Sequence, residues 1–492
     1  MRLILFGLIF IFISSSCDQG DIASSQNRGP RAQLDGPILE RDLAQIQADG
    51  KLRAIMIYSS TTYFLYRGEA MGYEYELLKR LADDLGLELE IVLAHNIDEV
   101  FDLLNKGEGD IIAYGLTITE ARKELIHFTD YLYTTHQALV QKKPRNWRRM
   151  RRDQIDRKLV RDVIDLIDDT VHVHRRSSYY ERLLNLQKEL GGKINIDTIT
   201  GDFNIEDVIK LVVDGKIDYT IADYNLASIN ATYYPILDVE TPVSFSQRIA
   251  WGIRNNSPEL EQAVNRWISG MRKNGTYNFI YKKYYSHKKT QKRRIESEFY
   301  SKNSGQISEY DELIKKAADS LGWDWRLLAS QVYQESRFDP QSKSWAGATG
   351  LMQIMPGTAS DLGVDQPFDP EQNLLAATAY LQYLFDKFPG ITDTVQRIKF
   401  TMAAYNCGYG HLLDAQRLAA KNGLDSLQFD NSTADWLRKM GQYKVYSDPI
   451  VRYGPVRGEE PYRYVNDIFL RYEHYRRLIP LNSADSLAMP EG

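Results

Sequence analysis

The hydrophobic pattern of this 492-residue chain changes near residue 287, and the change limits what each half can fold into. Before it, short apolar runs such as 52–57 and 110–113 alternate with amphipathic helical patterns such as 74–85. This alternation favours an α/β sheet with parallel strands. After it, helical periodicity dominates, over 310–321, 326–335, 356–362, 371–388 and 394–404. A chain of this length needs more than one core, so we expect an α/β domain followed by a mainly α domain.

The N-terminus has the features of a secretory signal. Arg2 precedes an apolar run over 3–13, which is too short to span a bilayer, and three serines then lead to Cys17. Small residues directly before a Cys resemble the bacterial lipobox, which implies lipidation of Cys17; the alternative is an ordinary signal peptide with an incidental Cys. We expect a periplasm-facing lipoprotein of the cell envelope, in the outer rather than the inner membrane.

Charge and composition exclude some partners and leave others open. The formal net charge is −5, which gives no reason to expect nucleic acid. The stretch 145–161 is strongly basic, and a solvated helix face is favoured there over contact with an anionic polymer. His172 and His174 share one face of a predicted strand, but no further ligand completes a metal site. We therefore predict no metal and no cofactor.

The second half contains two motifs with chemical meaning. Glu335 begins the run ESRFDP, and GATGLMQIMP begins at Gly347, which suggests a lone acid at a helix end facing a Gly-rich wall. Most glycosidases need two carboxylates, yet Asp339 is followed by Pro340 and is expected to cap a turn. One acid suffices where the sugar's own 2-acetamido group attacks C1. Such an acid needs apolar surroundings that raise its pKa.

Together with Ala404-Tyr405-Asn406 and Tyr464-Val465, these motifs resemble the catalytic domain of the soluble-lytic-transglycosylase type, lysozyme-like enzymes that cleave peptidoglycan. The resemblance implies that Glu335 protonates the MurNAc–GlcNAc β-1,4 bond and then deprotonates the 6-hydroxyl, leaving a 1,6-anhydro end. A water-using muramidase on the same fold stays an alternative. The resemblance also implies substrate contacts from Ser344, Gln353, Met355, Tyr405, Asn406 and Tyr464, although Ser344 can instead be a simple cap.

Five segments of the first half resemble the amino-acid-binding class of periplasmic solute-binding proteins, a two-lobed type II fold: 72–77, 109–113, 116–122, 128–130 and 215–223. The resemblance implies that Arg122 grips a ligand carboxylate and Asp223 its ammonium group, with Tyr58 and Tyr63 as walls. A structural salt bridge is the alternative for Arg122. A non-enzymatic binding lipoprotein is the second alternative for the whole chain.

The combination of the two halves is similar to the membrane-bound lytic transglycosylases of type F, which implies a sensing domain that regulates the catalytic one. The expected partners are peptidoglycan strands, an amino acid or muropeptide, and the membrane through the lipid. The expected organisation is a signal peptide (1–16), a lipidated tether (17–40), a solute-binding-like domain (41–285, second lobe about 143–245), a linker (286–306), the catalytic domain (307–480) and a tail (481–492).

Overall fold

The computed structural model describes residues 39–201 and 203–481, and the chain from Ile38 onward forms one compact unit. Cys17 and most of the predicted tether lie outside the described residues. Within the described part, no helix is long and apolar enough to cross a membrane.

The first lobe is built on a six-stranded sheet in which β4, β1 and β5 run parallel and β13 returns antiparallel to β5. Its strands are β1 (Lys51–Ile57), β4 (Glu88–Ala94), β5 (Ile111–Thr117), β6 (His127–Phe128), β7 (Tyr133–Thr135) and β13 (Gln247–Ile253). Its helices are α1 (Leu43–Asp49), α2 (Tyr73–Leu85), α3 (Ile97–Lys106), α4 (Glu120–Lys123), α9 (Pro258–Lys273) and α10 (Thr276–Tyr285). A separate hairpin, β2 (Phe64–Tyr66) and β3 (Glu69–Met71), leaves this lobe near α2.

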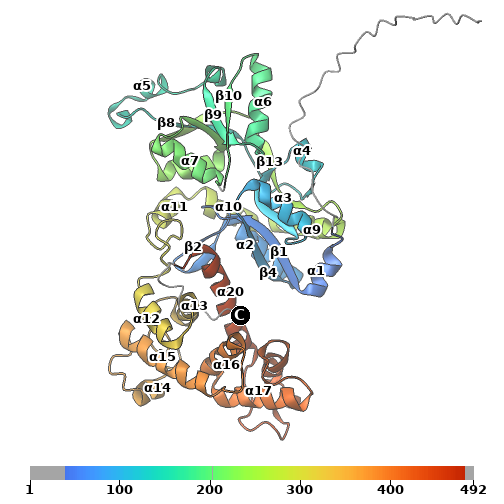
Figure 1. Ribbon diagram of the computed structural model, residues 1–492, viewed down its shortest axis with the longest axis vertical. Coiled ribbons are helices and arrows are strands. Elements are labelled where there is room, and N and C mark those ends of the chain that lie inside the picture. Colours follow the sequence, from blue (N-terminus) through green and yellow to red (C-terminus); the bar gives the residue numbers. More distant parts are fainter. Residues whose placement is uncertain (1–38, 202, 482–492) are drawn as a thin grey trace, which may run out of the picture. The chain divides into compact units, whose positions relative to one another are not determined.

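The second lobe is a five-stranded sheet of order β10-β9-β11-β8-β12. Its strands are β8 (Gln137–Lys142), β9 (Thr170–His174), β10 (Asn195–Ile199), β11 (Tyr219–Asp223) and β12 (Leu237–Pro242). Its helical segments are η1 (Trp147–Arg149), α5 (Arg152–Asp156), η2 (Val163–Leu166), α6 (Ser178–Leu190), α7 (Ile205–Asp214) and α8 (Tyr224–Tyr233). The chain enters this lobe just before β8 and leaves it between β12 and β13 (Figure 1).

The second half is helical, as its periodicity predicts. Its helices are α12 (Asp311–Leu321), α13 (Trp325–Ser336), α14 (Pro356–Asp361), α15 (Pro370–Asp386), α16 (Thr394–Cys407), α17 (Tyr409–Lys421), η3 (Phe429–Thr433), α18 (Ala434–Lys439), α19 (Tyr443–Tyr446) and α20 (Glu459–Leu478). The stretch expected to be a linker contains α11 (Lys288–Ile295).

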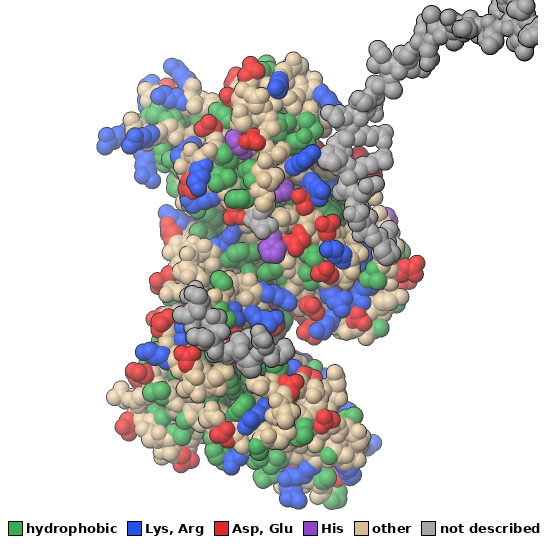
Figure 2. Space-filling view, in the orientation of Figure 1, with side chains coloured by type: hydrophobic (Ala, Val, Ile, Leu, Met, Phe, Trp, Pro, Cys, Tyr) green, Lys and Arg blue, Asp and Glu red, His purple; other side chains and the backbone are tan. Residues whose placement is uncertain are grey.

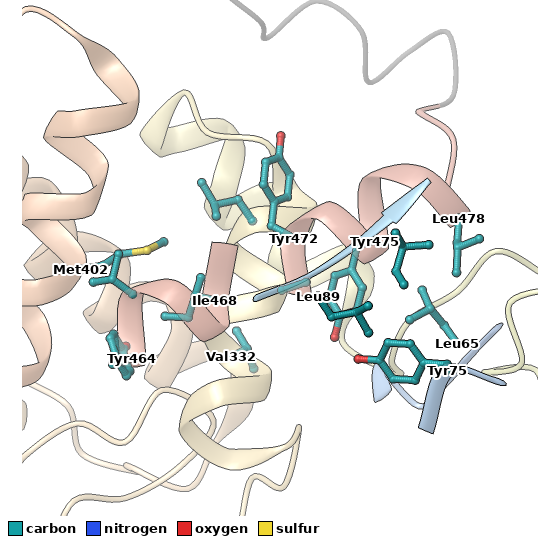
Figure 3. Close-up of a cluster of buried hydrophobic side chains, with 14 of the residues drawn as sticks. Leu65, Tyr75, Leu89, Val332, Met402, Tyr464, Ile468, Tyr472, Tyr475 and Leu478 are labelled. Carbon is teal, nitrogen blue, oxygen red and sulfur yellow. The ribbon is translucent and has the colours of Figure 1, made fainter. Parts of the chain in front are cut away.

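Helix α20 packs against α13, α16 and α18 and also reaches hairpin strand β2 of the first lobe. Figure 3 shows buried side chains along its whole length, from Tyr464 and Ile468 to Tyr475 and Leu478, with Leu65 and Tyr75 of the first lobe at the far end. One continuous apolar cluster therefore joins the first lobe to the helical half. Burial on this scale supplies most of the stabilisation of a helix in a folded protein.

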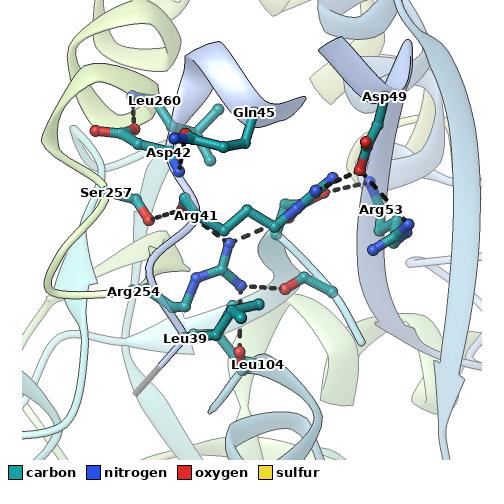
Figure 4. Close-up of polar contacts among 12 residues, drawn as sticks. Leu39, Arg41, Asp42, Gln45, Asp49, Arg53, Leu104, Arg254, Ser257 and Leu260 are labelled. Atoms are coloured by element: carbon teal, nitrogen blue, oxygen red, sulfur yellow. Dashed lines mark hydrogen bonds and ion pairs between the residues drawn. The ribbon is translucent and has the colours of Figure 1, made fainter. Parts of the chain in front are cut away.

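A buried ionic group fixes the start of the described chain to the first lobe. Asp110 is fully buried and accepts hydrogen bonds from Arg41 Nε (2.7 Å) and from Arg254 Nη2 (3.1 Å). Asp42 caps α1 and also accepts the backbone N–H of Leu260 (2.8 Å), as the polar contacts in Figure 4 show. Because buried charges are tolerated only when they are paired, these contacts specify where residues 39–49 lie.

Candidate functional site

Glu335 lies in the last turn of α13, which begins at the N-cap Asp324. The chain then turns sharply through Arg337 (φ 55°) and Phe338 (φ 62°), two successive residues in the left-handed region. Non-glycine residues hold this conformation only when their surroundings enforce it, and such strain is concentrated at functional sites. Asp339 Oδ1 accepts the N–H of Gln341 (2.9 Å), so Asp339 caps this turn as expected.

A hydrogen-bonded chain of side chains ends on the Glu335 carboxyl group. Tyr464 donates its hydroxyl to Glu335 Oε1, and Gln331 Nε2 donates to the Tyr464 hydroxyl (3.1 Å). Burial raises the pKa of Glu335 to about 7, while the hydrogen bond from Tyr464 acts in the lowering direction. A substantial fraction of this carboxyl group is therefore protonated at neutral pH.

An open groove of about 750 Å³ gives access to Glu335. Its other lining residues come from α13, α16 and the region around α18 and α20: Gln334, Asn406, Arg438, Gly441, Arg457, Gly458, Glu459, Glu460, Arg463, Tyr464 and Asp467. Glu459 accepts from Arg438 (2.9 Å) and Arg463 (3.0 Å), and the Arg438 guanidinium lowers the pKa of Glu459.

The run GATGLMQIMP, which begins at Gly347, forms a Gly-rich loop. The structure places four of the six predicted substrate contacts in this loop or against it. Ser344 Oγ accepts the N–H of Ala348 (3.0 Å), and Gln353 Nε2 donates to the carbonyls of Ser342 (3.1 Å) and Gly350 (2.9 Å). Tyr405 donates to the Met352 carbonyl (2.7 Å), and Met355 is 46% exposed at the start of α14. Asn406 and Tyr464, the other two, line the groove with Glu335.

Sequence reasoning missed two residues that hold this region together. Buried Asn373 accepts the N–H of Met352 (2.8 Å) and donates to Thr349 (3.0 Å) and Pro367 (2.9 Å), and a Cβ at Gly350 would lie 2.2 Å from its amide nitrogen. Gln331 is the other. Its position one helical turn before Glu335 was the available signal, because residues four apart share a helix face.

The first half contains a cavity of about 50 Å³ between the lobes. Arg122 and Asp223 both line it, and Arg122 Nη1 donates to the Thr117 carbonyl (3.0 Å). Within the described residues, Asp223 Oδ1 is buried without a hydrogen-bond partner, and burial raises the pKa of Asp223 to about 7. Burial lowers the pKa of Arg122. A carboxyl group and a guanidinium group that are incompletely paired can each form a hydrogen bond with a polar group of a ligand.

Tyr58 and Tyr63 do not line this cavity, contrary to expectation. Tyr58 donates to Ser301 Oγ (2.8 Å), and the Tyr63 hydroxyl is hydrogen-bonded to Nδ1 of His474 on α20. Both hydroxyl groups thus bond to residues that follow the solute-binding-like domain in the chain. His172 lies beside Asp197 (3.3 Å), and the described residues contain no cluster arranged to hold a metal.

Comparison with known families agrees with this two-part arrangement. Residues 312–428 match the transglycosylase SLT domain, and residues 55–287 match the bacterial extracellular solute-binding proteins of family 3. The chain is thus a transglycosylase of the SLT class joined to a domain of the solute-binding class, which confirms the predicted fold class.

The particular family follows from full-length relatives. The membrane-bound lytic murein transglycosylase F of Desulfosudis oleivorans is 33% identical over 433 residues, covering 88% of this chain and 91% of the relative. That of Pseudomonas fluorescens is 32% identical over 438 residues, covering 88% and 86%. The chain belongs to this family of lytic transglycosylases. Among solved structures, an ancestral arginine-binding protein bound to arginine shares 24% identity, covering 48% of this chain and 99% of that one, with a TM-score of 0.41.

The raised pKa of Glu335 predicts a pH-dependent stability. The carboxyl group ionises near 4.5 in the unfolded chain but near 7 in the native one, so the native state loses stability as the pH rises between these values. Glu335→Gln should therefore raise the free energy of unfolding at pH 8 by roughly 2–4 kcal/mol and change it little at pH 4. Urea unfolding at the two pH values measures this, with Asp467→Asn as an exposed control. An equal effect at both pH values would contradict the burial of the carboxyl group.

Proposed function

We propose that this chain cleaves the MurNAc–GlcNAc β-1,4 bond of peptidoglycan without water and leaves 1,6-anhydro-MurNAc ends. The observation that carries the proposal is the placement of Glu335: a buried carboxyl group with a pKa of about 7, at the wall of an open groove, hydrogen-bonded to Tyr464. An acid with this pKa can give up and regain a proton near neutral pH.

Glu335 would act twice in this reaction. It first gives its proton to the glycosidic oxygen while the acetamido oxygen of MurNAc attacks C1, so the bond to the departing GlcNAc breaks. The resulting carboxylate then removes the proton of the MurNAc 6-hydroxyl, whose oxygen closes on C1 and displaces the acetamido oxygen. Tyr464 stabilises the carboxylate between these steps through its donated hydrogen bond.

The hydrolytic alternative needs a second group to activate water. Glu459 is held by two arginines that favour its charged form, and Asp467 is exposed. Glu335→Gln should lower turnover of purified peptidoglycan at least about a thousandfold, whereas Asp467→Asn should stay within about twofold. Mass spectrometry of the wild-type digest should show anhydro ends. Products with reducing MurNAc, or loss of activity in Asp467→Asn, would favour a hydrolase.

We further propose that the first half binds an amino acid or muropeptide and regulates cleavage. The cavity between the lobes offers Arg122 for a carboxylate and Asp223 for an ammonium group. We expect the two lobes to separate as a ligand enters, because the cavity holds only about 50 Å³, and the bound ligand would set how the lobes close.

A direct contact could carry this change to Glu335. Tyr475 of α20 donates to the carbonyl of Gly68 at the tip of hairpin β2–β3 (2.7 Å). A Cβ at Gly68 would lie 2.7 Å from the ring of Phe338 and 3.0 Å from that of Tyr333. Phe338 belongs to the strained turn that follows Glu335, so the hairpin of the first lobe lies against the end of the catalytic helix.

Two substitutions separate ligand binding from transmission. Arg122→Ala should weaken binding of free amino acids or muropeptides at least about tenfold, because a buried charged hydrogen bond is lost. Tyr475→Phe should leave that affinity unchanged while reducing the effect of the ligand on peptidoglycan turnover. Calorimetry and turnover assays with and without ligand measure the two effects. A ligand effect that survives in both variants would contradict this route.

For location, we propose that Cys17 carries the lipid anchor and that residues up to 40 form its tether. Cys17→Ala should release the protein from the membrane fraction or leave its signal unprocessed, because one lipid-bearing thiol is removed. Fractionation of cells expressing either form, followed by immunoblotting, measures this. Unchanged attachment of a fully processed Cys17→Ala form would refute the lipid anchor.

A further inference from the structure

The basic segment, residues 142–161, connects β8 to η2 on the second lobe. It carries ten Lys or Arg residues and two Asp residues, in a chain whose formal net charge is −5. Figure 2 shows the blue side chains gathered over the place of α5 in Figure 1. None of these residues lines the catalytic groove or the cavity between the lobes.

Most of this positive charge is not neutralised inside the molecule. Arg161 is paired with Asp156 and Asp238, and Arg151 with Asp153 (3.2 Å). By contrast, no carboxylate of the described residues lies within ion-pair distance of the side chains of Arg145, Arg148, Arg149, Arg157 and Lys158, all of which are exposed. A cluster of unpaired guanidinium groups of this density creates a local positive potential that attracts anions.

The segment is nevertheless built into the fold. At its base, buried Gln141 accepts the N–H of Val160 (2.9 Å) and donates to the Val160 carbonyl (2.8 Å). Arg161 Nη1 also donates a hydrogen bond to Asp238 Oδ1 of β12 (2.6 Å). This clamp presents η1 and α5 as a defined projection from the sheet, so its charges have a fixed direction.

The apolar residues of the segment indicate which anionic surface it fits. Trp147 is half-buried between two cations, with Lys143 Nζ 4.8 Å and the Arg148 guanidinium 5.3 Å from its ring centroid. Met150 and Ile155 are also partly exposed between arginines. Tryptophan among basic residues is typical of protein surfaces that lie at the membrane interface, and clusters of four to eight basic residues bind anionic headgroups.

We propose that the basic segment docks the second lobe on a membrane surface rich in anionic phospholipid. The guanidinium groups would bind headgroup phosphates and Trp147 would lie at the headgroup level. This contact is separate from the proposed lipid anchor, since Cys17 is not part of the segment and none of the segment's residues takes part in that anchor. It needs only that the protein works beside a membrane, and it does not depend on the cleavage chemistry.

The test uses protein beginning at Ile38, which forms its own compact unit and lacks Cys17. It should sediment with vesicles of equal parts phosphatidylglycerol and phosphatidylcholine at about 50 mM NaCl, remain free with phosphatidylcholine alone, and be released at about 500 mM NaCl. Replacing Arg145, Arg148, Arg149 and Arg157 by Gln should weaken partitioning about a hundredfold.

A matched control removes the same charge elsewhere. Lys273, Lys289, Arg293 and Lys444 are exposed, and their replacement by Gln should change partitioning no more than about threefold. Both variants should unfold at the wild-type temperature and cleave peptidoglycan at the wild-type rate. If the first does not fold, the Arg149→Gln, Arg157→Gln double variant, expected to weaken partitioning about tenfold, replaces it.

Three outcomes would overturn the proposal: no binding of wild-type protein to anionic vesicles, equal losses in the two quadruple variants, or salt-independent binding. Sedimentation with purified peptidoglycan sacculi is measured in parallel. If the basic segment is required for sacculus binding but not for vesicle binding, its partner is the glycopeptide and the membrane assignment is wrong.

Discussion

The packing of helix α20 on α13 is the contact on which both halves of the molecule depend. Tyr464 near the start of α20 donates to Glu335, and Tyr475, eleven residues later, donates to Gly68 of the first lobe. Eleven residues are close to three full turns and span about 16 Å, so the two tyrosines lie on the same face of one stiff rod. One helix therefore contacts both the acid and the first lobe, and the proposed regulation would take this route.

Local sequence patterns predict much of the fold, and there is a physical reason for the main helix that they miss. The helix predicted over 74–85 is α2, and the acid predicted at a helix end lies in the last turn of α13. The helical patterns of the sequence end at residue 404 and do not predict a helix over the Tyr-rich stretch 459–478, although this stretch forms the 20-residue α20. Aromatic residues are only moderate helix formers, and α20 lacks a side-chain N-cap, so its stability comes from tertiary burial that local sequence does not show.

Site residues were harder to predict than elements, because a side chain's partner is set by the fold. Gln353 and Tyr405 have polar groups suited to a sugar, yet the structure uses these groups to brace the Gly-rich loop. Tyr63 precedes a hairpin whose direction no local pattern reveals, so its contact with His474 could not be anticipated. Asn406 and Tyr464 reach the groove because α20 packs on both α13 and α16, an arrangement that motif spacing alone leaves open.

Glu335 and the basic segment differ in how the fold places an ionisable group: the first is buried and the second is exposed to water. At Glu335, burial keeps a carboxyl group partly protonated, which weakens the native state at neutral pH but supplies an acid where a sugar can enter. In the basic segment, most of the guanidinium groups stay exposed to water, so they cost little in folding and keep their attraction for an external anion. The first arrangement suits proton transfer and the second suits attachment to an anionic surface. Under the two proposals, the groove in the helical half would act on the glycan strand while the projection on the second lobe binds the membrane beside it.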